Sequence, residues 1–204
     1  MTLQQGMHYN QIHCDRLFQS TLPNYTSIVT SAMSKIVDTN VLRLLALNPR
    51  IELIQFDSIV MYHGKPDPFV DGKYDPGEVH IKLPRSTVSQ GHSRNDFNAS
   101  FQGYRFLSQL AQTHEEAVGR TLMHEIAHHI QRRFYDNANQ PLRADWEEMW
   151  NRACKNQTFV SPYSSELISD YWAELVVAYT MEPRVHNMDV DGIAFVKKAL
   201  TLIK

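Results

Sequence analysis

Three residues within the stretch 121–130 have the types and the spacing that metal-assisted chemistry requires. His124 and His128 stand four positions apart, so on an α-helix both imidazoles lie on one face and can reach a single point. A zinc ion at that point would take one nitrogen from each ring, at about 2.0–2.1 Å. Glu125 follows the first histidine directly, where its carboxylate would flank the metal and act as general base for a water that the metal activates. The pattern predicts a zinc site that carries its own base.

The residues around this pattern favour a helix that is half buried. Leu122, Ile126 and Ile130 form an apolar stripe beside the histidines, as in a helix that lies between the core and a cleft. His129 would point about 100° away from His128, which indicates packing or a supporting contact rather than metal binding. A core helix that carries histidines by chance is the alternative interpretation, and a third metal ligand elsewhere in the chain argues against it.

A second segment supplies acidic side chains at helical spacing. Glu166, Asp170 and Glu174 are each four residues apart in an otherwise apolar stretch, for which we expect a helix over about 165–180. Carboxylates aligned on an apolar helix are costly to bury without a partner, and a metal with its histidine ligands is such a partner. One acid would complete the ligand set, and an acid one turn later would accept the free N–H of a ligand imidazole.

The two segments together resemble the zincin metallopeptidases. Within the zincins they look most like the gluzincin-like group that contains the anthrax lethal factor catalytic domain and the Pro-Pro endopeptidases. Members of that group carry HExxH, then a tyrosine, and seven residues after the tyrosine an acid. Two mostly aromatic positions follow the acid, and after them come Ala and Glu. This chain has HExxH, Tyr163, Asp170 and then Tyr-Trp-Ala-Glu at 171–174. The resemblance covers residues 115–180.

The resemblance implies a zinc-dependent endopeptidase that hydrolyses peptide bonds through a zinc-activated water. It implies one Zn²⁺ ion, bound by His124, His128 and Asp170. Glu125 would be the general base, and Tyr163 would be a second catalytic residue that stabilises the oxyanion. A protein or peptide is the expected substrate.

The third zinc ligand has an alternative. The family normally has glutamate where this chain has Asp170, whose side chain is one methylene shorter. A second way to align the segment matches the ExxxD pattern of thermolysin-like enzymes. In that alignment Glu166 would bind zinc, and Asp170 would contact a zinc ligand without binding the metal itself. The tyrosine spacing and the Ala-Glu pair favour Asp170 as ligand and Glu174 as the residue that supports a histidine. Glu166 remains the alternative third ligand.

Composition and charge are those of an ordinary globular protein. The chain has 204 residues, of which 43% are hydrophobic and 21% charged, so we expect a single domain over 1–204. A net charge of −2 gives no reason to expect nucleic acid as a partner. No apolar run approaches about 18 residues, so no membrane insertion is expected. The N-terminus lacks the basic and apolar regions of a Sec signal peptide, which predicts a cytoplasmic protein or one exported without a cleaved signal.

The expected fold class is α+β, with the zincin-like fold that the resemblance implies: a small mixed or antiparallel sheet, an active-site helix and a mainly helical C-terminal half. Residues 64–77 resemble an exposed loop. Residues 78–83 alternate between apolar and polar, which predicts a strand and a candidate edge that holds an extended substrate. Helices are expected over about 27–47, 114–135, 142–154 and 192–203, in addition to 165–180.

Two alternatives to this zinc-dependent endopeptidase stay open. One is a bacterial effector or toxin protease that is delivered into another cell. The other is a zincin fold retained for binding without catalysis, which an intact Glu125 argues against, because a structural zinc site needs no base. Cys14 and Cys154 are far apart in sequence, and we interpret both as buried free thiols.

Overall fold

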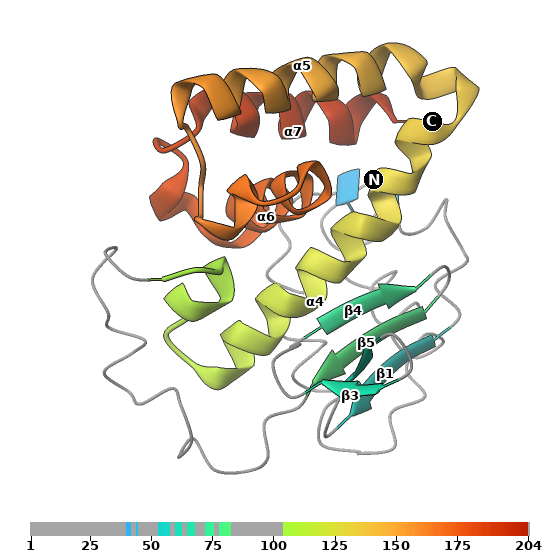
Figure 1. The fold of residues 1–204 in the computed structure, drawn as a ribbon, viewed down its shortest axis with the longest axis vertical. Coiled ribbons are helices and arrows are strands. Elements are labelled where there is room, and N and C mark those ends of the chain that lie inside the picture. The colour runs from blue at the N-terminus through green and yellow to red at the C-terminus, as the bar shows by residue number, and fades with distance from the viewer. Residues whose placement is uncertain are drawn as a thin grey trace, which may run out of the picture.

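One long helix, α4 (His114–Gln131), runs through the middle of the molecule, between a small sheet and a layer of helices (Figure 1). The computed structural model describes residues 40–41, 44, 53–57, 60–62, 65–67, 72–75, 78–82 and 104–203. On one side α4 packs against strands of the sheet, and on the other it packs against α6 (Ile168–Met181). This central position lets α4 present side chains to both layers.

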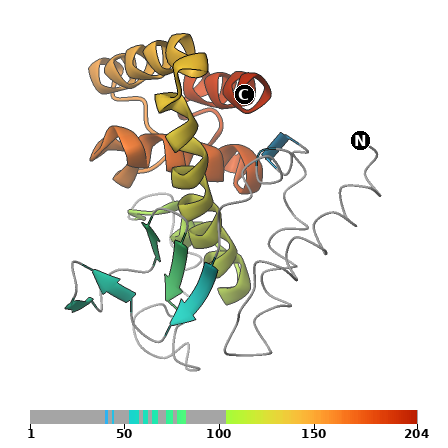
Figure 2. The same cartoon turned by 90° about the vertical axis from the view of Figure 1, so that its right-hand side faces the viewer.

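The C-terminal half is mainly helical, as expected. After α4 come α5 (Gln140–Asn156), α6 and α7 (Val190–Leu202), which Figure 2 shows stacked along the upper part of α4. The predicted helices over 114–135, 142–154 and 192–203 are present, the first ending as a 3-10 turn. Within residues 104–203, five short 3-10 helices connect the elements: η1 (Leu107–Leu110), η2 (Arg132–Tyr135), η3 (Asn137–Asn139), η4 (Tyr163–Ser165) and η5 (Pro183–Val185).

The described strands form a mixed three-stranded sheet and a separate hairpin-like pair. In the sheet, β5 (Glu78–Lys82) pairs in parallel with β1 (Leu53–Asp57) and antiparallel with β4 (Gly72–Asp75), in the order β1-β5-β4. The separate pair is antiparallel and consists of β2 (Val60–Tyr62) and β3 (Lys65–Asp67).

Two sequence predictions about this region were wrong. The stretch 64–77 is not simply a loop, because it contains β3 and β4. The strand predicted at 78–83 is not an edge, because β5 has a partner on each side, and β4 is the strand of the described sheet that ends it beside α4. The physical reason is that β4 is short and contains Gly72 and Asp75, residue types that are depleted in strands, so its pattern was hidden.

The core lies where α4 and α6 cross. Every residue from Asp170 to Ala178 is buried, which makes α6 the most enclosed helix of the described chain. The indole N–H of Trp172 donates to the carbonyl of Ala127 at 2.8 Å, and the Trp172 ring packs edge-on against Phe134. These contacts fix α6 against α4, so acids on α6 have a defined position relative to the histidines of α4.

Part of the N-terminal half can be compared with the predictions. Asn40, Val41 and Leu44 are helical, and both apolar residues of this group are buried. The rest of the helix predicted over 27–47, and Cys14, lie outside the described residues. Cys154 is a half-buried free thiol. Within the described part of the chain, no helix combines the length and the apolar character needed to cross a membrane.

Candidate metal centre and active site

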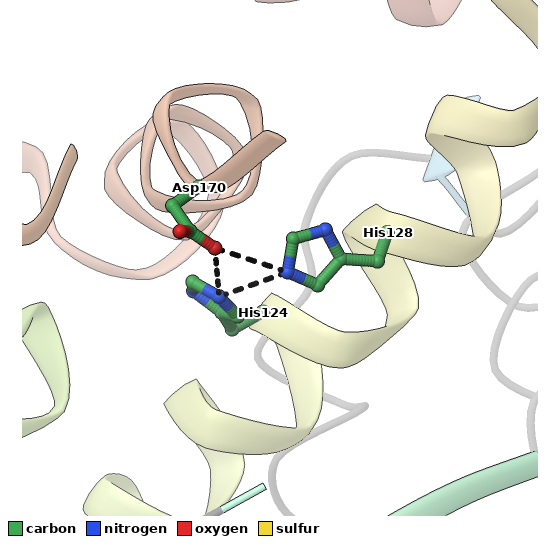
Figure 3. Close-up of side chains that lie close together, drawn as sticks. All are labelled: His124, His128 and Asp170. Atoms are coloured by element: carbon green, nitrogen blue, oxygen red, sulfur yellow. Dashed lines mark hydrogen bonds and ion pairs between the residues drawn. The ribbon is translucent and has the colours of Figure 1, made fainter. Parts of the chain in front are cut away.

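His124 and His128 of α4 and Asp170 of α6 converge on one point (Figure 3). The two Nε2 atoms are 3.1 Å apart, and Oδ1 of Asp170 lies 3.7 Å from Nε2 of His124 and 3.5 Å from Nε2 of His128. In a tetrahedral zinc site with bonds of about 2.0–2.1 Å, ligand atoms are separated by about 3.3 Å. The three distances therefore bracket the spacing that zinc requires. Among the described residues this is the one cluster of three or more possible metal ligands.

Each histidine has a partner for its other ring nitrogen. Nδ1 of His124 lies 3.0 Å from Oε1 of Glu174, and Nδ1 of His128 lies 3.3 Å from Oε1 of Gln131. With Nδ1–H donated to an oxygen, Nε2 is the nitrogen through which each ring can bind a metal once that nitrogen is deprotonated. Glu174 thus lies where its predicted supporting role places it. Gln131 was missed by the sequence analysis, although its position three residues after His128 on one helix face is the signal that would have found it.

The charges around the three candidate ligands favour a cation. Burial by itself would lower the pKa of His124, but its contacts with Asp170 and Glu174 and the charge of Glu125 outweigh burial and raise that pKa to about 10. Burial would raise the pKa of Asp170, but its contacts with the two histidines lower it to about 2. The carboxylate is therefore ionised at neutral pH, and the site already attracts positive charge.

Glu125 lies on the same helix, beside the ligands and next to β4. Its side chain is buried, and burial raises the pKa of its carboxyl. The charges of His124 and His128 lower that pKa, but burial has the larger effect. A Cβ atom added at Gly72 would lie 2.7 Å from Oε1 of Glu125 and 2.8 Å from Cγ2 of Thr121. Glycine at this position is what allows β4 to approach α4 so closely.

Tyr163 stands in η4, beside the first histidine. Its ring centroid is 5.8 Å from that of His124, and its backbone N–H donates to the carbonyl of Arg105 at 3.0 Å. The Phe106 ring packs edge-on against it at 4.6 Å, and the Arg105 guanidinium lies 5.7 Å from the Tyr163 ring centroid. Burial raises the pKa of the Tyr163 hydroxyl well above its usual range, so the phenol remains a hydrogen-bond donor.

Glu166, the alternative third ligand, does not join the histidines. Its carboxylate is bound by the Arg105 guanidinium at 2.8–3.1 Å, and both side chains are largely exposed. The prediction of a single helix over 165–180 was wrong at its start, because Leu167 is extended and α6 begins at Ile168. Glu166 therefore stands outside the helix that carries Asp170.

A local hydrogen-bond pattern explains this late start of α6. Ser161 and Ser164 exchange backbone-to-hydroxyl hydrogen bonds at 3.1–3.2 Å and form a separate turn that includes Pro162. Serine side chains compete in this way with helical hydrogen bonding. The turn presents Tyr163 to the site and directs Glu166 to the surface.

A second contact that the sequence did not reveal ties β4 to α4. The Tyr74 hydroxyl lies 3.0 Å from Nδ1 of His129, and Arg132 donates to the same hydroxyl at 3.3 Å. His129 is buried and contacts β4, and it is not one of the candidate metal ligands. Tyr74 fell in the predicted loop, and the Gly72-Lys-Tyr74 alternation was too short to indicate a strand.

Comparison of the chain with family descriptions, with curated proteins and with solved structures gave no match. What the site can do is therefore judged from its own residues. Two imidazoles and a carboxylate can bind a divalent cation, a buried carboxyl beside them can carry a proton, and a protonated phenol can donate a hydrogen bond.

Proposed function

We propose that this protein is a zinc-dependent endopeptidase whose single Zn²⁺ ion is held by His124, His128 and Asp170. The observation that carries the proposal is the set of ligand-atom distances, 3.1, 3.5 and 3.7 Å, in a site where each imidazole has an Nδ1 partner. Three protein ligands leave a fourth position open, which distinguishes catalytic zinc sites from structural ones.

Glu125 is the proposed general base. When bound, zinc would polarise the scissile carbonyl and lower the pKa of a water toward neutrality. Glu125 accepts the proton of the attacking water and passes it to the leaving amine. Burial supports this role, because a carboxyl with a raised pKa is a stronger base than an exposed one.

Tyr163 is the proposed donor to the oxyanion that develops on the substrate carbonyl. Its hydroxyl keeps its proton at neutral pH, as the direction of its pKa shift requires. The contacts of its ring with Phe106 and Arg105, and its backbone hydrogen bond to Arg105, hold it beside His124.

The proposed substrate is an extended peptide or protein segment that pairs with β4. An edge strand offers backbone N–H and C=O groups to an extended chain, and side-chain pockets then add selectivity. The substrate-holding role predicted for residues 78–83 therefore passes to Gly72–Asp75, the strand whose glycine lies against Glu125.

The proposal is tested by metal analysis and by cleavage of a mixed peptide library. The purified full chain should contain close to one zinc per molecule by mass spectrometry of the metal. It should cleave peptides internally, lose that activity to a chelator and recover it with added zinc. Stoichiometric zinc without chelator-sensitive cleavage would instead favour a fold retained for binding, and absence of zinc binding would refute the metal centre.

A further inference from the structure

A cluster of charged side chains beside helix η1 consists of the buried Arg120 and Glu182 and the more exposed Arg184. The side chain of Arg120 is 7% exposed and that of Glu182 is 1% exposed, and Nη2 of Arg120 lies 2.8 Å from Oε2 of Glu182. Arg184 donates to both carboxylate oxygens of Glu182. Burial would raise the pKa of Glu182, but Arg184 and Arg120 together lower it, so the carboxylate is ionised.

Both arginines also hold the short helix η1. Nη1 of Arg120 donates to the carbonyl of Leu107 at 2.9 Å, and Nη2 of Arg184 donates to the carbonyl of Leu110 at 2.9 Å. These are the first and last residues of η1. Glu182 binds both arginines and is therefore the common anchor of the two ends.

The same helix η1 makes a direct contact with the metal centre. The N–H of Leu107 donates to Oε2 of Glu174 at 3.0 Å, and Oε1 of Glu174 lies 3.0 Å from Nδ1 of His124. The carbonyl of Leu107 thus accepts a hydrogen bond from Arg120, and its N–H donates one to Glu174. A continuous series of buried hydrogen bonds connects Glu182 with the first histidine.

We propose that Arg120 and Glu182 are positioning residues for the metal centre: they fix the backbone of Leu107, which orients Glu174, which in turn aims His124. The inference rests on the proposed function only in that the site binds zinc. Partners that orient a metal-binding histidine change metal affinity by about 10–100-fold when they are lost. Glu182 acts through two intermediates, so its loss should lie near the lower end of that range.

Zinc affinity of the full chain, measured by competition with a chromophoric chelator at fixed pH, tests this without using proteolysis. Glu182→Gln should weaken zinc binding about tenfold although no candidate ligand is altered. Glu174→Gln should weaken it more. Because both act through one contact, the double variant should bind zinc no worse than Glu174→Gln alone, to within about twofold.

Asp189→Asn is the matched control. Asp189 is also buried, and it accepts hydrogen bonds from Tyr171 and from the N–H of Gly192, neither of which belongs to η1. The control makes the same carboxylate-to-amide change in the core, and its zinc affinity should stay within about twofold of wild type. Equal losses in Asp189→Asn and Glu182→Gln would reduce the cluster to a stabilising role and overturn the proposal.

Arg120→Lys keeps the experiment decisive if Glu182→Gln does not fold. Lysine keeps the charge but lacks the guanidinium group, whose two nitrogens bind the Leu107 carbonyl and Glu182 at the same time. Zinc binding should therefore weaken about tenfold. Unchanged affinity in a folded Arg120→Lys or Glu182→Gln variant, or additive losses in the double variant, would overturn the proposal.

Wild-type protein that binds zinc but cleaves no peptide would refute the endopeptidase alone, and wild-type protein that binds no zinc would refute both.

Discussion

Nδ1 of His124 and Oε1 of Glu174 lie 3.0 Å apart, and both side chains are buried. His128 has a weaker counterpart, because its Nδ1 lies 3.3 Å from the neutral amide oxygen of Gln131. Each contact leaves Nε2 turned toward the shared point with Asp170. The two histidines are thus prepared for the same metal by partners of different strength.

This difference predicts unequal effects on zinc binding. Glu174→Gln should weaken zinc binding about 10–100-fold, since the amide lacks the negative charge that raises the basicity of the imidazole. Gln131→Ala should cause a smaller loss, because it removes a neutral and longer contact. Chelator competition on both variants gives the comparison, and a larger effect at Gln131 would contradict the assigned roles.

The identity of the third ligand can be tested by two matched substitutions. Asp170→Asn should lose zinc on dialysis, because the amide is a poor ligand and the site loses its ionised acid. Glu166→Gln should keep zinc and fold normally, since an exposed ion pair such as the one with Arg105 contributes only about 0–1 kcal/mol. Metal content of the dialysed proteins decides between them, and the reverse result would restore Glu166 as ligand.

Zinc affinity should depend strongly on pH. The pKa of His124 is raised to about 10 in the metal-free protein, so at pH 7 this imidazole carries a proton that zinc must displace. Affinity should therefore fall as pH falls, by about tenfold per unit for one displaced proton. Calorimetry in buffers of different ionisation enthalpy should detect about one proton released per zinc at pH 7. Affinity that is constant between about pH 6 and 8 would contradict the charge arrangement.

Gly72→Ala should impair catalysis more than metal binding. The added methyl group would meet Oε1 of Glu125 at 2.7 Å and Cγ2 of Thr121 at 2.8 Å, so the Glu125 side chain or β4 itself must shift. We expect a lower kcat with zinc content unchanged. Lys73→Ala is the control on the neighbouring residue of β4, and it should leave kcat near wild type. Full activity of Gly72→Ala would show that β4 does not restrict the base.

The sequence predicted the parts of the site that lie within one helix. His124, Glu125 and His128 follow from helical spacing alone. The apolar helix indicated only that some of its acids need a partner, and the family resemblance selected Asp170 and Glu174 among them. Glu166 was misplaced because the helical period continues through it, while the Ser161–Ser164 hydrogen bonds begin a separate turn that no periodicity reveals.

The remaining parts depend on contacts between distant segments. Leu107 acts through its backbone N–H and carbonyl, and backbone groups carry no sequence signal. Arg120 and Glu182 are 62 positions apart in the chain (182 − 120), so their pairing appears only in the fold. Tyr74 meets His129 because β4 lies against α4, a strand too short for its pattern to be recognised.

The central claim, that Glu125 serves as the base of a zinc peptidase, is tested most directly by Glu125→Gln in the zinc-loaded protein. The amide keeps the shape of the side chain but cannot accept the proton. We predict one zinc per chain, an unchanged melting profile and a loss of about 10²–10⁴-fold in the rate of cleavage of the best library peptide. Cleavage by the folded, zinc-loaded variant at the wild-type rate would contradict the claim.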